Sequence, residues 1–574
     1  MANSMKRLWD YRNYVIAITT PLLILPLPVV VNTSEAKCGF LLILMAVYWC
    51  TECLPLAITA LLPVIFFPLL GIMTAEQVCL QYFSDGIVLG LGGVVVAIAV
   101  EQWNLHKRLA LAILLVVGVK PALLMLGFMS ITAFLSMWIS NIACTAIMLP
   151  IVHDILEHLR TTEAENDERE LQKSRAIQSS QRHETRDGTG NFQEWNPKEL
   201  LSDEQKYQSL RKGMSMSVCY AASIGGTATL TGSIPNLILK GQLDKIFPKN
   251  GDVINYASWF GFAFPNMLLM LILSWLLLHF MYLGFNVKST FGCGMTRGSQ
   301  QAVYQVMRQE FKKLGSMSFA ESSVLVLFIL LVLLWFTRDP GFIPGWASLL
   351  FKQEKMFVTD ATVSILITFL FFIIPSEFPR CWHAGSLDIT DRSKGEAPAT
   401  LLTWHVVQKV LPWNILLLLG GAFALAKGSE ISNLSMWLGH TVLPLGSIPP
   451  VALSFVLCIV VTMLTEICSN TVISSVILPI LASMASALKV HPLSIMLPPT
   501  ISSSFAFMLP VATPPNAITF TYANLKIMDM VKPGLVLNLL GVVCINLAVQ
   551  TWGAAIFHLN EFPEWANVTN SQTP

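Results

Sequence analysis

The feature that most constrains this 574-residue chain is a series of long apolar segments along almost its whole length. They lie at residues 14–31, 39–72, 86–100, 109–127, 128–152, 214–240, 259–285, 322–336, 357–374, 410–427, 451–488, 492–520 and 533–556. Charged residues make up only 12% of the chain, about half the share in a typical soluble domain. Since one aqueous core cannot bury so much apolar surface, lipid must be part of the solvent. The sequence predicts an all-α protein that crosses the membrane many times.

The segment lengths also predict interrupted helices. A membrane-spanning helix needs about 20 residues. Segments such as 451–488 and 492–520 are too long for one helix and too short for two full crossings. We therefore expect broken helices or re-entrant hairpins.

Basic residues predict the orientation of the chain. Lys6, Arg7 and Arg12 precede the first apolar segment, which has no clear small-residue cleavage site. This segment is expected to be a first transmembrane helix whose N-terminus lies in the cytoplasm. The polar stretches at 161–213, 286–321 and 375–409 contain basic residues and are expected on the same side.

Three glycosylation sequons begin at Asn32, Asn433 and Asn567. Asn567 is the strongest candidate, because it lies in a polar tail after the last apolar segment. Its modification would place the C-terminus outside the cell.

Charge and cysteine usage argue against several other classes. The net charge is +1 without a basic stripe, so nucleic acid is not an expected partner. The 11 cysteines are scattered, mostly inside apolar runs, which argues against a disulfide framework. No cofactor is expected.

An internal repeat indicates where the functional site lies. Residues 140–151 read SNIACTAIMLPI, and residues 469–480 read SNTVISSVILPI. Upstream, a Gly-Gly pair ends 48 residues before Asn141 in the first copy and 49 residues before Asn470 in the second. The chain therefore contains two copies of one unit, an arrangement found in secondary transporters.

A further pair of motifs follows each copy. Residues 232–236 read GSIPN and residues 512–516 read ATPPN. Neither can continue as a regular helix, because proline removes a backbone donor and restricts the residue before it. Irregular backbone at membrane depth is tolerated where it lines a cavity or is buried in protein.

The chemistry of these motifs favours ion binding. They offer hydroxyl, amide and backbone oxygens, which suit a hard cation such as sodium, and they contain no Arg or Lys. An anionic substrate would need counter-charge from co-bound sodium ions and from the N-terminal ends of broken helices.

The sequence resembles the divalent anion:sodium symporter family, specifically its animal sodium-dicarboxylate and citrate cotransporters. The likeness covers nearly the whole chain and is carried by YWCTE at 48–52, WNLHKR at 103–108, LSMWISN at 135–141, IGGTATLTG at 224–232 and FMLPVATPPN at 507–516.

This resemblance implies a homodimer in the plasma membrane. Each protomer would have about eleven spans and two re-entrant hairpins in an inverted repeat, and a transport domain would move as an elevator against a scaffold. The implied division is 1–83 (N-terminal spans, mainly scaffold), 84–160 and 214–285 (first repeat), 161–213 (polar cytoplasmic loop), 286–409 (cytoplasmic loops and scaffold spans), 410–532 (second repeat) and 533–574 (last span and extracellular tail).

The resemblance also implies the site residues. One sodium site would use Ser136, Ser140, Asn141 and backbone at Gly232. The other would use Thr465, Cys468, Asn470 and backbone at Ala512. The carboxylates of a dicarboxylate or citrate would meet Ser140, Asn141, Ser233, Ser469, Asn470, Thr471 and Thr513.

Two details bear on the substrate. The sulfate-carrying branch has Ser-Asn-Pro and Asn-Pro-Pro-Asn where this chain has Ser-Asn-Thr and Thr-Pro-Pro-Asn, so a carboxylate is expected rather than sulfate. The first family motif is Ser-Asn-Thr, whereas this chain has Ile142 in the third place. Ile142 is expected to lie at the substrate site and to weaken binding, or else to pack between helices.

An intramembrane enzyme and a channel are the two alternative functional classes. An intramembrane enzyme would need a nucleophile and base or paired aspartates, and none occurs at helical spacing. A channel fits duplicated ion sites less well than alternating access does.

Overall fold

The structure is a computed structural model that describes residues 11–117, 121–158, 160–161, 197–284, 297–341, 343–351, 357–377, 398–442 and 448–567. In these ranges it is helical, with one isolated antiparallel bridge between Pro375 and Thr400. The helices in the first half are α2 (Arg12–Ile24), α3 (Ser34–Thr51), α4 (Leu56–Ala60), α5 (Leu62–Leu69), α6 (Ala75–Cys79), α7 (Asp85–Gln102), α8 (Leu105–Val117), α9 (Pro121–Ser136), a helix at 141–158, α11 (Pro197–Gly226), α12 (Ile234–Ile246) and α13 (Tyr256–Leu278).

The second half continues in the same way. Its helices are α14 (Arg297–Lys313), α15 (Phe319–Arg338), α16 (Trp346–Leu350), α17 (Asp360–Ile373), α18 (Trp404–Val410), α19 (Trp413–Ile431), α20 (Leu434–Val442), α21 (Pro450–Thr465), α22 (Asn470–Leu488), α23 (Pro492–Ser502), α24 (Pro514–Tyr522), α25 (Ile527–Ala548) and α26 (Ala554–Phe557).

Eight helical stretches in the described ranges are long and apolar enough to cross a membrane, and four further apolar helices are shorter. The short group includes Pro121–Ser136 and Pro450–Thr465, each of which is followed directly by a break and a second helix. The prediction of an all-helical, multi-spanning protein with interrupted helices is therefore confirmed. The count of eleven spans stays a prediction.

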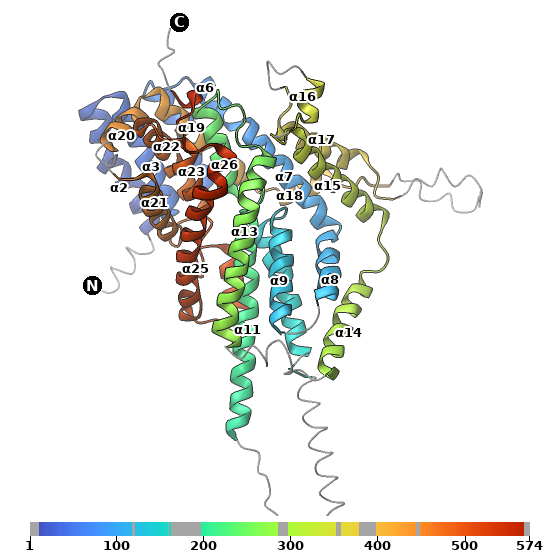
Figure 1. Cartoon of the computed structure of the whole chain (residues 1–574). Coiled ribbons are helices and arrows are strands. Elements are labelled where there is room, and N and C mark those ends of the chain that lie inside the picture. The colour runs from blue at the N-terminus through green and yellow to red at the C-terminus, as the bar shows by residue number, and fades with distance from the viewer. Residues whose placement is uncertain are drawn as a thin grey trace, which may run out of the picture.

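The helices form a bundle whose two ends differ (Figure 1). Helices α6, α16 and α26 lie at one end, while the start of α11 and helix α14 project at the other. Inside the bundle, α9 packs against α11, and α21 packs against α23. These two pairs, which come from the two sequence repeats, form corresponding parts of the architecture.

The polar stretches contain more helix than the sequence predicted. The stretch 161–213 was expected as a loop, but α11 already begins at Pro197, while residues 162–196 lie outside the described part. Similarly, α14 occupies Arg297–Lys313 within the stretch 286–321, and α18 lies at the end of 375–409. Because residues such as Glu, Gln, Lys and Arg form helices readily, helix can continue past the apolar part of a span.

The Gly-Gly landmarks of the repeat are sites of close helix packing. A Cβ atom at Gly92 on α7 would meet Ser364 Oγ of α17 at 2.3 Å. A Cβ atom at Gly420 on α19 would meet the ring of Tyr82 at 2.3 Å. The glycines are needed because neighbouring segments approach α7 and α19 too closely for any side chain.

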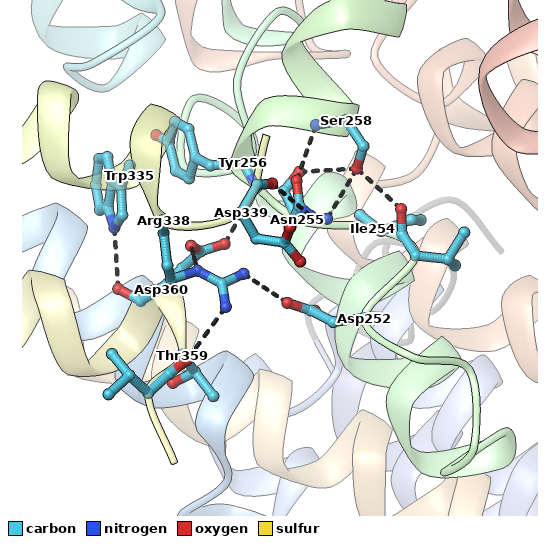
Figure 2. A network of polar contacts seen from close by, with 12 residues as sticks. Asp252, Ile254, Asn255, Tyr256, Ser258, Trp335, Arg338, Asp339, Thr359 and Asp360 are labelled. Carbon is cyan, nitrogen blue, oxygen red and sulfur yellow. Dashed lines mark hydrogen bonds and ion pairs between the residues drawn. The ribbon is translucent and has the colours of Figure 1, made fainter. Parts of the chain in front are cut away.

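A buried network of charges joins separate parts of the bundle (Figure 2). Arg338, at the end of α15, places Nε 2.6 Å from Asp360 Oδ1 and Nη2 2.5 Å from Asp252 Oδ2. Lys240 of α12 lies 2.5 Å from the other oxygen of Asp252. These four side chains are between 1% and 9% exposed, so the charges depend on one another rather than on water for stabilisation.

We expect Arg338→Met to destabilise the protein strongly. The substitution leaves Asp252 and Asp360 buried without their shared cation, and removing one partner of a buried ion pair costs about 3–5 kcal/mol. Thermal denaturation of detergent-purified protein should show a lower midpoint. Lys427→Met is the matched control, because it breaks a partly exposed pair with Glu430 and should cost no more than about 1 kcal/mol. Equal midpoints for the two variants would contradict the expectation.

Candidate ion and substrate site

The first break lies between α9 and the helix at 141–158. Ser136, the last residue of α9, is fully buried. Its Oγ lies 2.5 Å from Asn141 Oδ1 and 2.6 Å from the carbonyl oxygen of Ala222 on α11. A hydroxyl, an amide oxygen and a backbone carbonyl therefore converge where the helix is interrupted.

The second break repeats this arrangement. Thr465, the last residue of α21, places Oγ1 2.6 Å from Asn470 Oδ1 and 2.8 Å from the carbonyl oxygen of Ser503. In both breaks the hydroxyl residue precedes its asparagine by five positions. The internal repeat read from the sequence is thus also a repeat of contacts.

Two further helix breaks follow α11 and α23, and at each break an asparagine side chain bonds to the backbone on the other side. Asn236 Nδ2 donates to the carbonyls of Gly226 and Thr229, at 3.3 and 2.8 Å. Asn516 Nδ2 donates to the carbonyls of Ala506 and Leu509, at 2.8 and 3.0 Å. The acceptors lie ten and seven residues before the amide in both copies. These asparagines replace donors that the broken helix lacks, which makes their role structural.

All four breaks are followed by a helix N-terminus. The residues that precede these helices are Ser140, Ser233, Ser469 and Thr513. Ser233 and Ser469 make no side-chain cap bond to their own helices. Helix N-termini favour negative charge, because unpaired N–H groups and the helix dipole point toward it.

One contact brings the two repeats together. Ser233 Oγ, at the start of α12, lies 3.3 Å from Ser504 Oγ in the break after α23. Thus a break of the first repeat faces a break of the second.

The predicted site residues differ in exposure. Those of the second repeat's motifs, Thr465, Thr471, Ala512 and Thr513, are buried, and so is Ser136 in the first. Ser140 is exposed, and Asn141, Gly232, Ser233, Cys468, Ser469 and Asn470 are half-buried. The contacts join Ser136 with Asn141, and Thr465 with Asn470. Cys468 lies beside Cys50 of α3.

The chain matches the family described as sodium:sulfate symporter transmembrane region over residues 6–559. This chain belongs to that family.

Curated members of the symporter family are similar over their full length. Human solute carrier family 13 member 2 is 49% identical over 99% of this chain and 97% of its own. The mouse Na(+)/citrate cotransporter is 47% identical over 98% of both chains. Human Na(+)/dicarboxylate cotransporter 3 is 43% identical over 99% of this chain and 96% of its own. The resemblance inferred from the motifs is confirmed.

In this symporter family member, the residue that follows the hydroxyl residue of the break is charged in one copy of the repeat, Glu466, and neutral in the other, Met137. Glu466, directly after Thr465, is 3% exposed, and its carboxylate accepts hydrogen bonds from the N–H groups of Met508 and Leu509, at 3.0–3.2 Å. Asn538 Nδ2 donates to it at 2.6 Å. At the equivalent place in the first repeat, the carbonyl of Met137 accepts from Thr229 Oγ1. The irregular backbone beside the break is therefore held by a carboxylate in the second copy and by neutral groups in the first.

The structure adds residues that the motifs did not identify. Ala222, Ser503 and Ser504 contribute oxygens to the contacts described above. The run Ser502-Ser503-Ser504, inside an apolar segment, is a signal that could have identified two of them. Nothing in the sequence near Ala222 marks its carbonyl.

Proposed function

We propose that this chain is a sodium-coupled symporter that imports dicarboxylates or citrate. The observation that carries the proposal is the paired set of breaks, in which a hydroxyl, an asparagine oxygen and a carbonyl converge without any basic side chain. The relatives named above as Na(+)/citrate and Na(+)/dicarboxylate cotransporters support it. They also favour transport over an intramembrane enzyme, and carboxylate over sulfate.

The proposed ion sites follow the two breaks. Ser136, Ser140, Asn141 and the backbone of Gly232 form the first sodium site. Thr465, Cys468, Asn470 and the backbone of Ala512 form the second. Neutral oxygens suit a cation that must be released again in each cycle.

The proposed substrate site lies between the four helix N-termini. Carboxylates accept from the hydroxyls and amides of Ser140, Asn141, Ser233, Ser469, Asn470, Thr471 and Thr513. Bound sodium and the helix dipoles supply the positive charge that these side chains lack.

The proposed transport cycle is an elevator movement within a homodimer in the plasma membrane. Residues 1–83 and 286–409 mainly form the scaffold, and the repeat units 84–160, 214–285 and 410–532 contribute the site. The N-terminus is cytoplasmic, and the C-terminus is extracellular with a glycan on Asn567. Asn567 is exposed after the last described helical turn, which is compatible with modification.

We expect this protein to take up succinate or citrate in a sodium-dependent and electrogenic way. An excess of sodium over substrate charge moves net positive charge inward, and each such charge gains about 2.3 kcal/mol per 100 mV. Purified protein in liposomes should concentrate labelled substrate when a sodium gradient is applied. A channel would only equilibrate the substrate, an enzyme would alter it, and equal uptake in sodium and choline media would refute the proposal.

Asn141→Ala and Asn470→Ala should each abolish uptake while surface expression is largely kept. Each amide serves an ion and a carboxylate, and losing a hydrogen bond to a charged group costs about 1.5–3 kcal/mol. Asn546→Ala is the matched control, since this buried asparagine pairs with Ser454 away from the breaks. Uptake per surface molecule should be retained in the control, and near-normal uptake by either test variant would show the site to be misassigned.

Ile142→Thr should lower the half-saturating concentrations of succinate and citrate. Ile142 is 46% exposed, whereas Thr471 at the equivalent position is buried. The side chain of Ile142 is therefore accessible, which is compatible with a place at the substrate site. A new hydroxyl–carboxylate bond contributes about 1.5–3 kcal/mol, or up to roughly a hundredfold in affinity. Ile467→Thr, at an apolar residue that is 76% exposed in the other break, is the control. Unchanged half-saturation in the Ile142 variant would exclude position 142 from binding.

A further inference from the structure

We infer that the buried charge network of Lys240, Asp252, Arg338 and Asp360 is a latch. It holds the segment from α12 to the start of α13 against the α15–α17 pair in this conformation, and it must open during each transport cycle. The inference rests on the proposed function, because only a carrier that moves its site needs such a step.

At the latch, three polar contacts join the two groups of helices (Figure 2). Asp252 pairs with Arg338 at 2.5 Å, the backbone N–H of Tyr256 donates to Asp360 Oδ2 at 3.1 Å, and Asn255 Nδ2 donates to the carbonyl of Asp339 at 3.3 Å. Residues 252–256 belong to the first repeat, whereas 338–360 belong to the proposed scaffold. The network therefore crosses the boundary along which an elevator would slide.

The latch is connected directly to the site. Lys240 lies seven residues after Ser233 on α12 and bonds both Asp252 and the carbonyl of Ile254, at 2.5 and 2.8 Å. The hydroxyl of Tyr256 lies 2.5 Å from Thr231 Oγ1, one residue before Gly232. The break that carries Gly232 and Ser233 is thereby fixed to the residues that hold Arg338 and Asp360.

Tyr256 adds an aromatic contact across the same boundary. Its ring stacks on Trp335 of α15, with centroids 4.0 Å apart and planes at 13°. Trp335 Nε1 in turn donates to the carbonyl of Asp360 at 2.9 Å. The first residue of α13 thus meets both helices of the α15–α17 pair.

The α7–α12 contact nearby is close and is made by glycines and apolar side chains. A Cβ atom at Gly86 of α7 would lie 3.6 Å from the Cα atom of Gly241 on α12, and one at Gly90 would lie 3.1 Å from Leu237. Smooth apolar surfaces resist sliding less than charge pairs do. Because buried charges cannot separate without replacement partners, the network gives the interface a discrete closed state.

Covalent closure of this boundary tests the latch. Asn255→Cys and Asp339→Cys are combined in a chain in which the exposed Cys50 and Cys79 are replaced by serine. This pair leaves all four network charges in place. Sodium-dependent uptake of labelled succinate in liposomes is measured before oxidation, after oxidation with copper phenanthroline, and after reduction with dithiothreitol.

The matched control pair is Ser376→Cys with Ala399→Cys. The N–H of Ser376 donates to the carbonyl of Ala399 at 2.8 Å, and both residues belong to the scaffold group. Oxidation of Asn255→Cys/Asp339→Cys should lower uptake by about tenfold or more, reversibly, because the population is confined to one state. The oxidised control should transport as before.

Two results would overturn the latch. One is full uptake by Asn255→Cys/Asp339→Cys after its cross-link is verified by mass spectrometry. The other, which does not depend on cysteine pairs, is an unchanged maximal rate per surface molecule for Asp252→Asn. We expect this rate to change by about threefold or more while half-saturating succinate stays within about twofold, because Asp252 touches no proposed ligand. Absence of sodium-dependent uptake in the unmodified protein would instead refute the proposed function, so it is measured first.

Discussion

Backbone hydrogen bonding inside the bilayer is the constraint on which the rest of this structure depends. Lipid offers no partners for free N–H and C=O groups, so a helix that stops at membrane depth must be completed by the protein itself. Here the amides of Asn236 and Asn516 and the carboxylate of Glu466 complete it. This fixing of irregular backbone holds the carbonyls and hydroxyls near the breaks in the places where the proposed ligands would meet them.

The sequence predicted the parts of the site that are local or duplicated. The Ser-Asn motifs mark helix breaks in the structure, and the repeat that they define extends to contacts with identical offsets. The same reading treated Asn236 and Asn516 as landmarks, because a sequence does not tell whether an amide faces a ligand or its own backbone. Polar composition also suggested a loop at 197–213, which the structure shows as helix.

Groups that depend on distant partners could not be predicted in this way. Arg338 reaches Asp252 across 86 positions and Asp360 across 22, and no periodic pattern joins them. Glu466 is a carboxylate inside the apolar segment 451–488. Its partners at 508, 509 and 538 follow only from the fold. Tertiary pairing therefore determines the electrostatics of this protein, while local patterning determines where its helices stop.

The difference between Glu466 and Met137 has a consequence for the unloaded carrier. The N–H groups of Met508 and Leu509 and Nδ2 of Asn538 donate to the Glu466 carboxylate, and donors of this kind favour its ionised form. The proposed moving unit would then carry this negative charge, beside charges such as Lys240 and Asp252, on its way back without cargo. A membrane potential that is negative inside pushes such a charge outward. Through Glu466, the voltage that draws sodium in would thus also favour the return of the empty site to the outside.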